Sequence, residues 1–141
     1  MVGLSGKDKH KISEAIQEAE RLTSGEIRVH IKNKCSEDTL AEAKKVFLKL
    51  KMQKTKKRNA VLIFLALDSR RFAILGDAGI DAKVGATFWD HTRDQMAKHF
   101  SAGRVAQGVI AGVLSAGEKL EEHFPYRKND RDELSNSVTA S

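Results

Sequence analysis

The chain contains few of the residues that would restrict its fold or identify a reaction. Among its 141 residues there are one cysteine, one proline, one tyrosine and one tryptophan. A single cysteine excludes an internal disulfide and a zinc site built from several cysteines. The longest apolar run, from Ala60 to Leu67, is far shorter than the roughly 20 residues that a membrane-spanning helix needs. Nucleotide-binding glycine loops, zinc-protease motifs and nucleophile elbows are also missing, so no local motif defines a reaction.

The composition is that of one ordinary globular domain. Hydrophobic residues make up 40% of the chain and charged residues 31%, and the length fits a single domain. We expect a flexible N-terminus over residues 1–6, a folded domain over residues 7–124 and a polar, disordered tail over residues 125–141. The N-terminus lacks the apolar core of a secretory signal, which predicts a cytoplasmic protein, and the shortness of the longest apolar run predicts that it has no transmembrane segment.

Hydrophobic periodicity predicts the main elements of this domain. Apolar residues at helical spacing predict four helices, over residues 7–22, 37–50, 86–100 and 104–123. The second of these would be capped by Ser36. Alternation predicts a strand at Ile27–Ile31, and a run that is apolar on both faces predicts a central strand at Ala60–Leu67. A third strand at Arg71–Leu75 follows closely enough to form an antiparallel hairpin with the second.

These elements predict a three-layer α/β sandwich around a small mixed sheet. The first strand, the second helix and the second strand form a crossover unit, which makes the two strands parallel with a right-handed connection. The antiparallel hairpin adds the third strand, and helices cover both faces. Gly108, Gly112 and Ser115 recur on one side of the last helix and predict its close packing on the sheet.

The polarity of the predicted sheet brings several polar loops to one edge. The starts of the first and second strands and the end of the third strand meet there. The candidate binding residues at this edge are Thr23, Ser24, Gly25, Arg58, Asn59, Gly76 and Gly79. Arg104, at the start of the last helix, is a further candidate for holding a phosphate near the same edge. Glycines in such loops let backbone groups approach a ligand closely.

Three carboxylates, Glu26, Asp77 and Asp81, belong to the same predicted edge. Carboxylates that lie close together share a proton or bind a hard cation such as Ca²⁺ or Mg²⁺. The alternative is that Glu26 and Asp81 are caps, that Asp77 forms a turn and that the glycines serve only backbone geometry. The residue pattern leaves both interpretations open.

The positive charge of the chain, +6 overall, is concentrated in one segment. Residues 44–58 carry no acid, and their basic side chains are Lys44, Lys45, Lys49, Lys51, Lys54, Lys56, Lys57 and Arg58. Such a patch attracts nucleic acid, an anionic membrane face or an acidic partner. The plainer interpretation, a solvated helix face followed by a lysine-rich loop, is favoured because no aromatic residues interleave to stack on bases. A nucleic-acid partner is therefore not expected.

Five segments in register resemble the TPM domain family, which is named for thylakoid-lumen, photosystem II-repair and receptor-associated members. They are residues 23–29, 58–63, 76–81, 100–104 and the helix through residue 108. The resemblance extends from Lys9 to Phe124 and implies a small α/β sandwich. One departure is that Asp77 and Ala78 follow the first glycine of the glycine-rich turn, where an aromatic residue is usual.

The resemblance implies alternative functions. Members of the family are credited with acid-phosphatase activity and with Ca²⁺ binding, and others assist membrane-protein maintenance without evident catalysis. The leading hypothesis is a non-catalytic binding or accessory module that meets a protein partner through the glycine–acid edge or through the basic residues of segment 44–58. The first alternative is a phosphatase in which Glu26, Asp77 and Asp81 hold Ca²⁺ or Mg²⁺, with no catalytic residue assigned. The second alternative is weak polyanion binding through residues 44–58.

Overall fold

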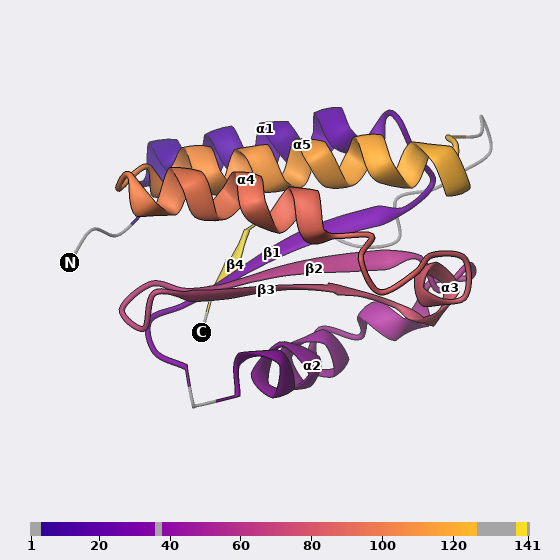
Figure 1. The fold of residues 1–141 in the computed structure, drawn as a ribbon, viewed down its shortest axis with the longest axis horizontal. Helices are drawn as coiled ribbons and strands as arrows, with labels where there is room; N and C mark the ends of the chain where they lie inside the picture. The colour runs from indigo at the N-terminus through magenta and orange to yellow at the C-terminus, as the bar shows by residue number, and fades with distance from the viewer. Residues whose placement is uncertain (1–3, 36–37, 127–137, 141) are drawn as a thin grey trace.

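The computed structural model describes residues 4–35, 38–126 and 138–140. Figure 1 shows its helices and strands, coloured from the N-terminus to the C-terminus. They are α1 (Gly6–Glu20), β1 (Glu26–Lys32), α2 (Thr39–Lys49), the short 3₁₀ helix η1 (Met52–Lys54), β2 (Ala60–Ala66), β3 (Arg71–Gly76), α3 (Ala78–Asp81), α4 (Asp90–Ser101), α5 (Val105–His123) and β4 (Thr139–Ala140). Within the part of the chain that is described, no helix is both long and apolar enough to cross a membrane.

The strands form one mixed sheet in the order β3-β2-β1-β4. β1 and β2 are parallel, and β2 and β3 are antiparallel, which confirms the predicted crossover and hairpin. The short strand β4 pairs with β1 where Thr139 lies opposite His30, a pairing that the sequence did not predict. Most of the predicted tail, residues 127–137, lies outside the described residues. At the other terminus residues 1–3 are also outside them, and α1 already begins at Gly6.

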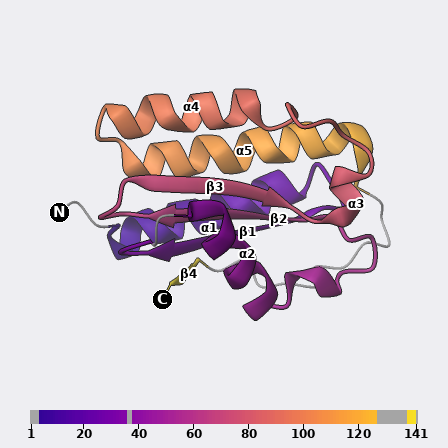
Figure 2. The same cartoon turned by 60° about the horizontal axis from the view of Figure 1, so that its bottom comes forward.

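Helices cover both faces of the sheet, as a three-layer sandwich requires. α1, α4 and α5 lie on one face, and α2 lies on the other (Figures 1 and 2). Every residue of β2 is buried, and its side chains alternate between the two hydrophobic cores: Ile63 belongs to the core under α1 and α5, and Phe64 to the core under α2. This arrangement explains why the run from residue 60 to 66 is apolar on both faces.

The ends of the helices are set by local hydrogen bonds. α1 begins with a capping box, in which the Asp8 backbone N–H donates to Ser5 Oγ at 3.0 Å and the Ser5 backbone N–H donates to Asp8 Oδ2 at 3.2 Å. The predicted cap of the second helix, Ser36, lies outside the described residues. The N-cap of α2 is Asp38, whose Oδ1 accepts a hydrogen bond from the Ala41 backbone N–H at 2.9 Å. α4 begins at Asp90 rather than residue 86 because the preceding residues form turns.

The small residues of α5 face another helix. A Cβ added at Gly108 would lie 2.4 Å from the ring of Phe100, and one added at Gly112 would lie 2.4 Å from the sulfur of Met96. Phe100 and Met96 both belong to α4. The prediction that these small residues pack on the sheet is therefore wrong, because their side of α5 accommodates the bulky side chains of α4.

The position of His30 predicts that the stability of the fold depends on pH. Its ring is buried, stacks on Phe64 and has Nδ1 at 2.7 Å from Thr139 Oγ1. Burial, followed by the positive charges of Lys32, Lys49 and Arg28, lowers the pKa of His30 from its ordinary value of 6.5. As the pH falls below 6.5, the unfolded chain therefore takes up this proton before the folded chain does. Stability that is present above pH 6.5 is lost as the pH falls toward the lower folded-state pKa.

We expect His30→Gln to reduce this pH dependence. Urea unfolding at about pH 7.5 and about pH 5.5 should show a smaller difference in the free energy of unfolding for the variant than for the parent. The control is His10→Gln, because His10 lies on the exposed face of α1. An equal pH dependence in the parent and in His30→Gln would contradict the assignment.

Candidate functional site

The starts of β1 and β2 and the end of β3 meet at one edge of the sheet, as predicted. Glu26 lies opposite Ala60, and Val61 lies opposite Gly76. We call this region, made of residues 23–26, 56–59 and 76–81, the loop edge; α3 marks it in Figure 1. The C-terminal end of α5 also reaches it, since the Ser24 backbone N–H donates to the carbonyl of Phe124 at 2.8 Å.

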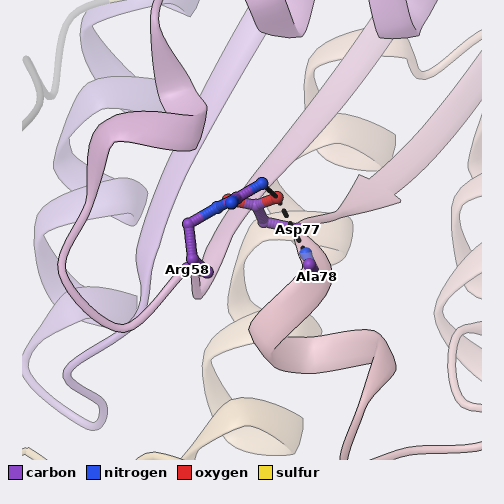
Figure 3. Close-up of polar contacts among 3 residues, drawn as sticks. All are labelled: Arg58, Asp77 and Ala78. Carbon is purple, nitrogen blue, oxygen red and sulfur yellow. Dashed lines mark hydrogen bonds and ion pairs between the residues drawn. The ribbon is translucent and has the colours of Figure 1, made fainter.

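The main polar contact of the loop edge joins Arg58 to Asp77 (Figure 3). Arg58 Nε donates to Asp77 Oδ2 at 2.6 Å, and Nη2 donates to Oδ1 at 2.8 Å. Asp77 Oδ1 also accepts a hydrogen bond from the Ala78 backbone N–H at 2.7 Å, so Asp77 caps α3. The carboxylate is 6% exposed, whereas the Arg58 side chain is 48% exposed. The hydrogen bonds and charge of Asp77 raise the pKa of Arg58 above its ordinary value.

The backbone around this pair is constrained. Arg58 has a φ of 52°, in the left-handed region that residues other than glycine rarely adopt. Its carbonyl accepts a hydrogen bond from the Gly79 backbone N–H at 2.8 Å. A Cβ on Gly79 would lie only 2.1 Å from the carbonyl oxygen of Lys57. Gly79 therefore allows α3 to approach the segment before β2, which is the backbone role that the sequence left as an alternative.

The residues before β1 tie the loop edge to the end of α5. Thr23 Oγ1 donates to the carbonyl of Phe124 and accepts a hydrogen bond from the Gly25 backbone N–H at 3.0 Å. Asn59 Nδ2 donates to Ser24 Oγ at 3.4 Å. Thr23 and Asn59 are both buried. These predicted binding residues therefore connect segments of the fold, and the exposed chemistry of the edge lies around Arg58.

The three predicted carboxylates do not form a common ligand set. Glu26 is buried at the start of β1, Asp77 is bound to Arg58, and Asp81 is exposed on α3. Across residues 4–35, 38–126 and 138–140, no three His, Cys, Asp or Glu side chains are grouped so that they could hold a metal ion. The structure therefore does not bring Glu26, Asp77 and Asp81 together, which was one of the two interpretations that the sequence left open; the side chain that Asp77 meets is the guanidinium of Arg58.

Arg104 lies at the opposite edge of the sheet. The neighbouring Gly103 and Val105 line a cavity of about 610 Å³ together with Asp68 and Arg70 of the β2–β3 turn. Arg104 itself donates from Nε to Nδ1 of His99 at 3.2 Å. The prediction that it joins the loop edge is wrong, because α5 begins at the far edge and reaches the loop edge only at its C-terminal end.

Two polar residues near the loop edge were not predicted from the sequence. The buried side chain of Glu20, at the end of α1, accepts a hydrogen bond from the Ile27 backbone N–H at 2.9 Å. Lys83 Nζ donates to the carbonyl of His123 at 3.3 Å and lies 4.4 Å from the centroid of the Phe124 ring. These contacts form only where α1 meets β1 and where the segment after α3 meets the end of α5, so helical spacing alone could not predict them.

The basic patch divides into two parts. All seven of its lysines are exposed. The first part is on α2, with Lys44, Lys45 and Lys49, and the second is the connection from α2 to β2, with Lys51, Lys54, Lys56 and Lys57. Buried Met52 and Thr55 anchor the connection. Its last lysines precede Arg58 directly and so adjoin the loop edge.

The fold is a small α/β sandwich with a polar loop edge. Comparison with known protein families shows the family to which it belongs. The family model of the TPM domain matches residues 3–119. The chain therefore belongs to the TPM domain family. The match supports the resemblance seen in the sequence.

Solved structures agree with this membership. The chain is similar to the BA42 protein of the psychrophilic bacterium Bizionia argentinensis, with 40% identity, a TM-score of 0.93, and coverage of 99% of this chain and 97% of BA42. An N-terminal domain from P. gingivalis shares the fold at 21% identity, with a TM-score of 0.70 and coverage of 89% and 83%. The N-terminal domain of the cg2496 protein of Corynebacterium glutamicum does so at 17% identity, with a TM-score of 0.65 and coverage of 82% and 72%. A comparison with curated proteins gave no match.

Proposed function

We propose that the domain is a non-catalytic binding module that recognises an acidic segment of a protein partner at the loop edge. This proposal rests on one observation, the difference in exposure between the two side chains of the Arg58–Asp77 pair. Asp77 is almost entirely covered and accepts hydrogen bonds from Arg58 and from the backbone of Ala78, whereas about half of Arg58 is exposed. The edge therefore presents hydrogen-bond donors to the solvent, and its central carboxylate is already occupied.

The exposed guanidinium suits the recognition of a carboxylate. A guanidinium has five N–H donors in a planar array, and Asp77 uses only two of them. Because Asp77 already holds the group in one orientation, less conformational entropy is lost when a partner binds. The Arg58–Asp77 pair carries little net charge, so the adjoining Lys56 and Lys57 supply the attraction for an acidic segment. Arg58 then supplies the directional hydrogen bonds.

The geometry gives less support to a metal-assisted phosphatase. That mechanism needs carboxylates that converge on a divalent cation, which in turn polarises a phosphoryl oxygen. Both oxygens of Asp77 accept hydrogen bonds from Arg58, and Glu26 and Asp81 do not complete a ligand group with it. Because Arg58 already occupies Asp77, this arrangement gives little support to a Ca²⁺ or Mg²⁺ ion at the loop edge.

We expect an acidic peptide to bind at the loop edge in a way that requires Arg58. The probe is a soluble peptide of alternating glutamate and glycine, titrated into the isotope-labelled domain and followed by amide NMR. Shifts should centre on residues 56–59 and 77–79, and Arg58→Ala should weaken binding roughly tenfold or more, the range of one charged hydrogen-bond pair. Arg58→Lys should recover only part of the affinity, since lysine lacks the planar array of donors.

A matched control lies on α4, where Arg93 and Asp90 form an exposed ion pair with an N–O distance of 2.9 Å. Arg93→Ala should leave peptide binding unchanged. Shifts confined to other surfaces, or equal binding by Arg58→Ala, would overturn the proposal. Turnover of a phosphomonoester that is lost in Asp77→Asn, with the fold intact, would favour the phosphatase instead.

A further inference from the structure

The outer side of α2 forms a second exposed surface, distinct from the loop edge. α2 is the helix that covers the lower face of the sheet in Figure 1, and its far side faces away from the rest of the domain (Figures 1 and 2). Leu40 is 46% exposed and Leu48 is 58% exposed. Two of the five large hydrophobic side chains that are exposed in the described part of the chain therefore lie on this one helix.

The two leucines alternate with a lysine along one side of the helix. Leu40, Lys44 and Leu48 follow one another at intervals of four residues, so they lie above one another on the helix surface. Ala43 and Phe47 are buried and point toward the sheet. The leucines are thus not part of the core under α2. They are two separate exposed apolar side chains, about 12 Å apart along the helix, with Lys44 between them.

Positive charge surrounds these two leucines. Lys45 and Lys49 are exposed on the side of the helix beyond Leu48, and Lys51 follows the helix directly. Glu42 is the acidic residue of α2. Its side chain is 15% exposed and forms an ion pair with Lys32 at an N–O distance of 3.3 Å. From residue 43 to residue 67 the sequence contains no acid. The surface therefore combines exposed apolar groups with an excess of positive charge, since its four lysines outnumber the acids Asp38 and Glu42 at the start of the helix.

We propose that this surface, made of Leu40, Lys44, Lys45, Leu48, Lys49 and Lys51, docks on an anionic phospholipid bilayer. The lysines would lie over the lipid phosphates, and the two leucines would enter the boundary between headgroups and acyl chains. Exposed leucines distinguish a bilayer from a nucleic acid, because a phosphodiester backbone offers them no apolar environment. Nucleic-acid surfaces of this kind also use aromatic side chains to stack on bases, and the aromatic residue of α2, Phe47, is buried.

Binding of this kind should be reversible and should depend on salt. Few side chains enter the bilayer, so attraction to anionic headgroups must add to the contribution of the leucines. The electrostatic part weakens as salt screens the lysines. Since the loop edge lies at one end of the sheet and not under α2, a domain docked in this way would keep Arg58 accessible.

The experiment is sedimentation of the full chain with vesicles of phosphatidylcholine, with and without about one third phosphatidylglycerol. We expect binding at low salt only when phosphatidylglycerol is present. The variant K44E/K45E/K49E should bind more weakly, by at least roughly fivefold for each lysine replaced. The variant L40S/L48S should bind roughly tenfold more weakly at the same net charge. Amide NMR spectra establish that each variant is folded.

The matched control is K7E/K9E/K11E on α1, which makes the same change in net charge on the opposite side of the molecule. It should bind the vesicles like the parent, apart from a modest loss. Arg58→Ala should also bind like the parent, which separates this proposal from the function proposed for the loop edge. The proposal is overturned if anionic vesicles are not bound, if the α1 control loses as much as the α2 variant, if L40S/L48S binds unchanged, or if a DNA duplex binds this surface while vesicles do not.

Discussion

Replacing Gly79 with alanine is expected to destabilise the domain by about 2 to 3 kcal/mol, the upper range for overpacking a tight contact. The added Cβ would lie 2.1 Å from the carbonyl oxygen of Lys57 and 2.6 Å from that of Arg58. Both obstacles are backbone atoms, so no side chain can rotate away. Relief requires α3 to move from the segment before β2, which would break the hydrogen bond from the Gly79 N–H to the Arg58 carbonyl.

The same displacement should disturb the Arg58–Asp77 pair, because Asp77 immediately precedes α3. Urea unfolding measures the loss of stability, and amide shifts at residues 57–60 and 77–80 measure the displacement. Gly85→Ala is the matched control, since a Cβ at Gly85 would have no neighbour within 4 Å. We expect its free energy of unfolding to change by less than about 0.5 kcal/mol. Similar stabilities for the two variants would contradict the close approach at Gly79.

Gly117→Ala is expected to destabilise the contact between α1 and α5 by about 2 kcal/mol. A Cβ on Gly117 would lie 2.7 Å from Cβ of Ala19, 2.9 Å from its Cα and 3.0 Å from its carbonyl oxygen. In an exposed helix the same substitution would stabilise by about 1 kcal/mol through helix propensity. A net loss of stability in Gly117→Ala would therefore be direct evidence of the steric conflict.

A double-mutant cycle with Ala19→Gly tests this reading. Ala19→Gly should itself destabilise α1 by about 1 kcal/mol. Combined with Gly117→Ala, it removes the nearest obstacle, so the double variant should be more stable than the sum of the single effects predicts. Gly112→Ala should cost less than Gly117→Ala, because the obstacle there is the flexible side chain of Met96. Additive effects in the cycle, measured by urea unfolding, would contradict direct contact between residues 19 and 117.

The sequence alone predicted the parts of the fold that depend on one-dimensional patterns. The run from Ala60 onward is apolar on both faces because β2 lies between two cores, and that pattern was enough to place it at the centre of the sheet. The close succession of β2 and β3 was enough to predict the hairpin, and strand polarity brought the segments of Gly25, Arg58 and Gly76 to one edge.

The parts that failed depend on the directions of side chains and on which helices meet. Gly112 was expected to face the sheet, but periodicity defines only the side of a helix and not the element that covers it. Arg104 was placed at the wrong edge because the direction of α5 across the sheet was not fixed by its own pattern. Arg58 and Asp77 were both candidates, yet their pairing spans 19 positions and follows from the left-handed backbone at Arg58 and the close approach of Gly79.

The most direct test of the loop edge as a recognition surface is NMR observation of the Arg58 Nε–H group. A hydrogen bond from Nε to Asp77 at 2.6 Å should protect this proton from exchange and give it a separate signal. We predict that Asp77→Asn weakens the signal, that the glutamate–glycine peptide shifts it in a saturable way, and that millimolar Ca²⁺ or Mg²⁺ leaves it unchanged. An unprotected Nε–H in the parent, or its release by Ca²⁺ with shifts at Glu26 and Asp81, would contradict the account.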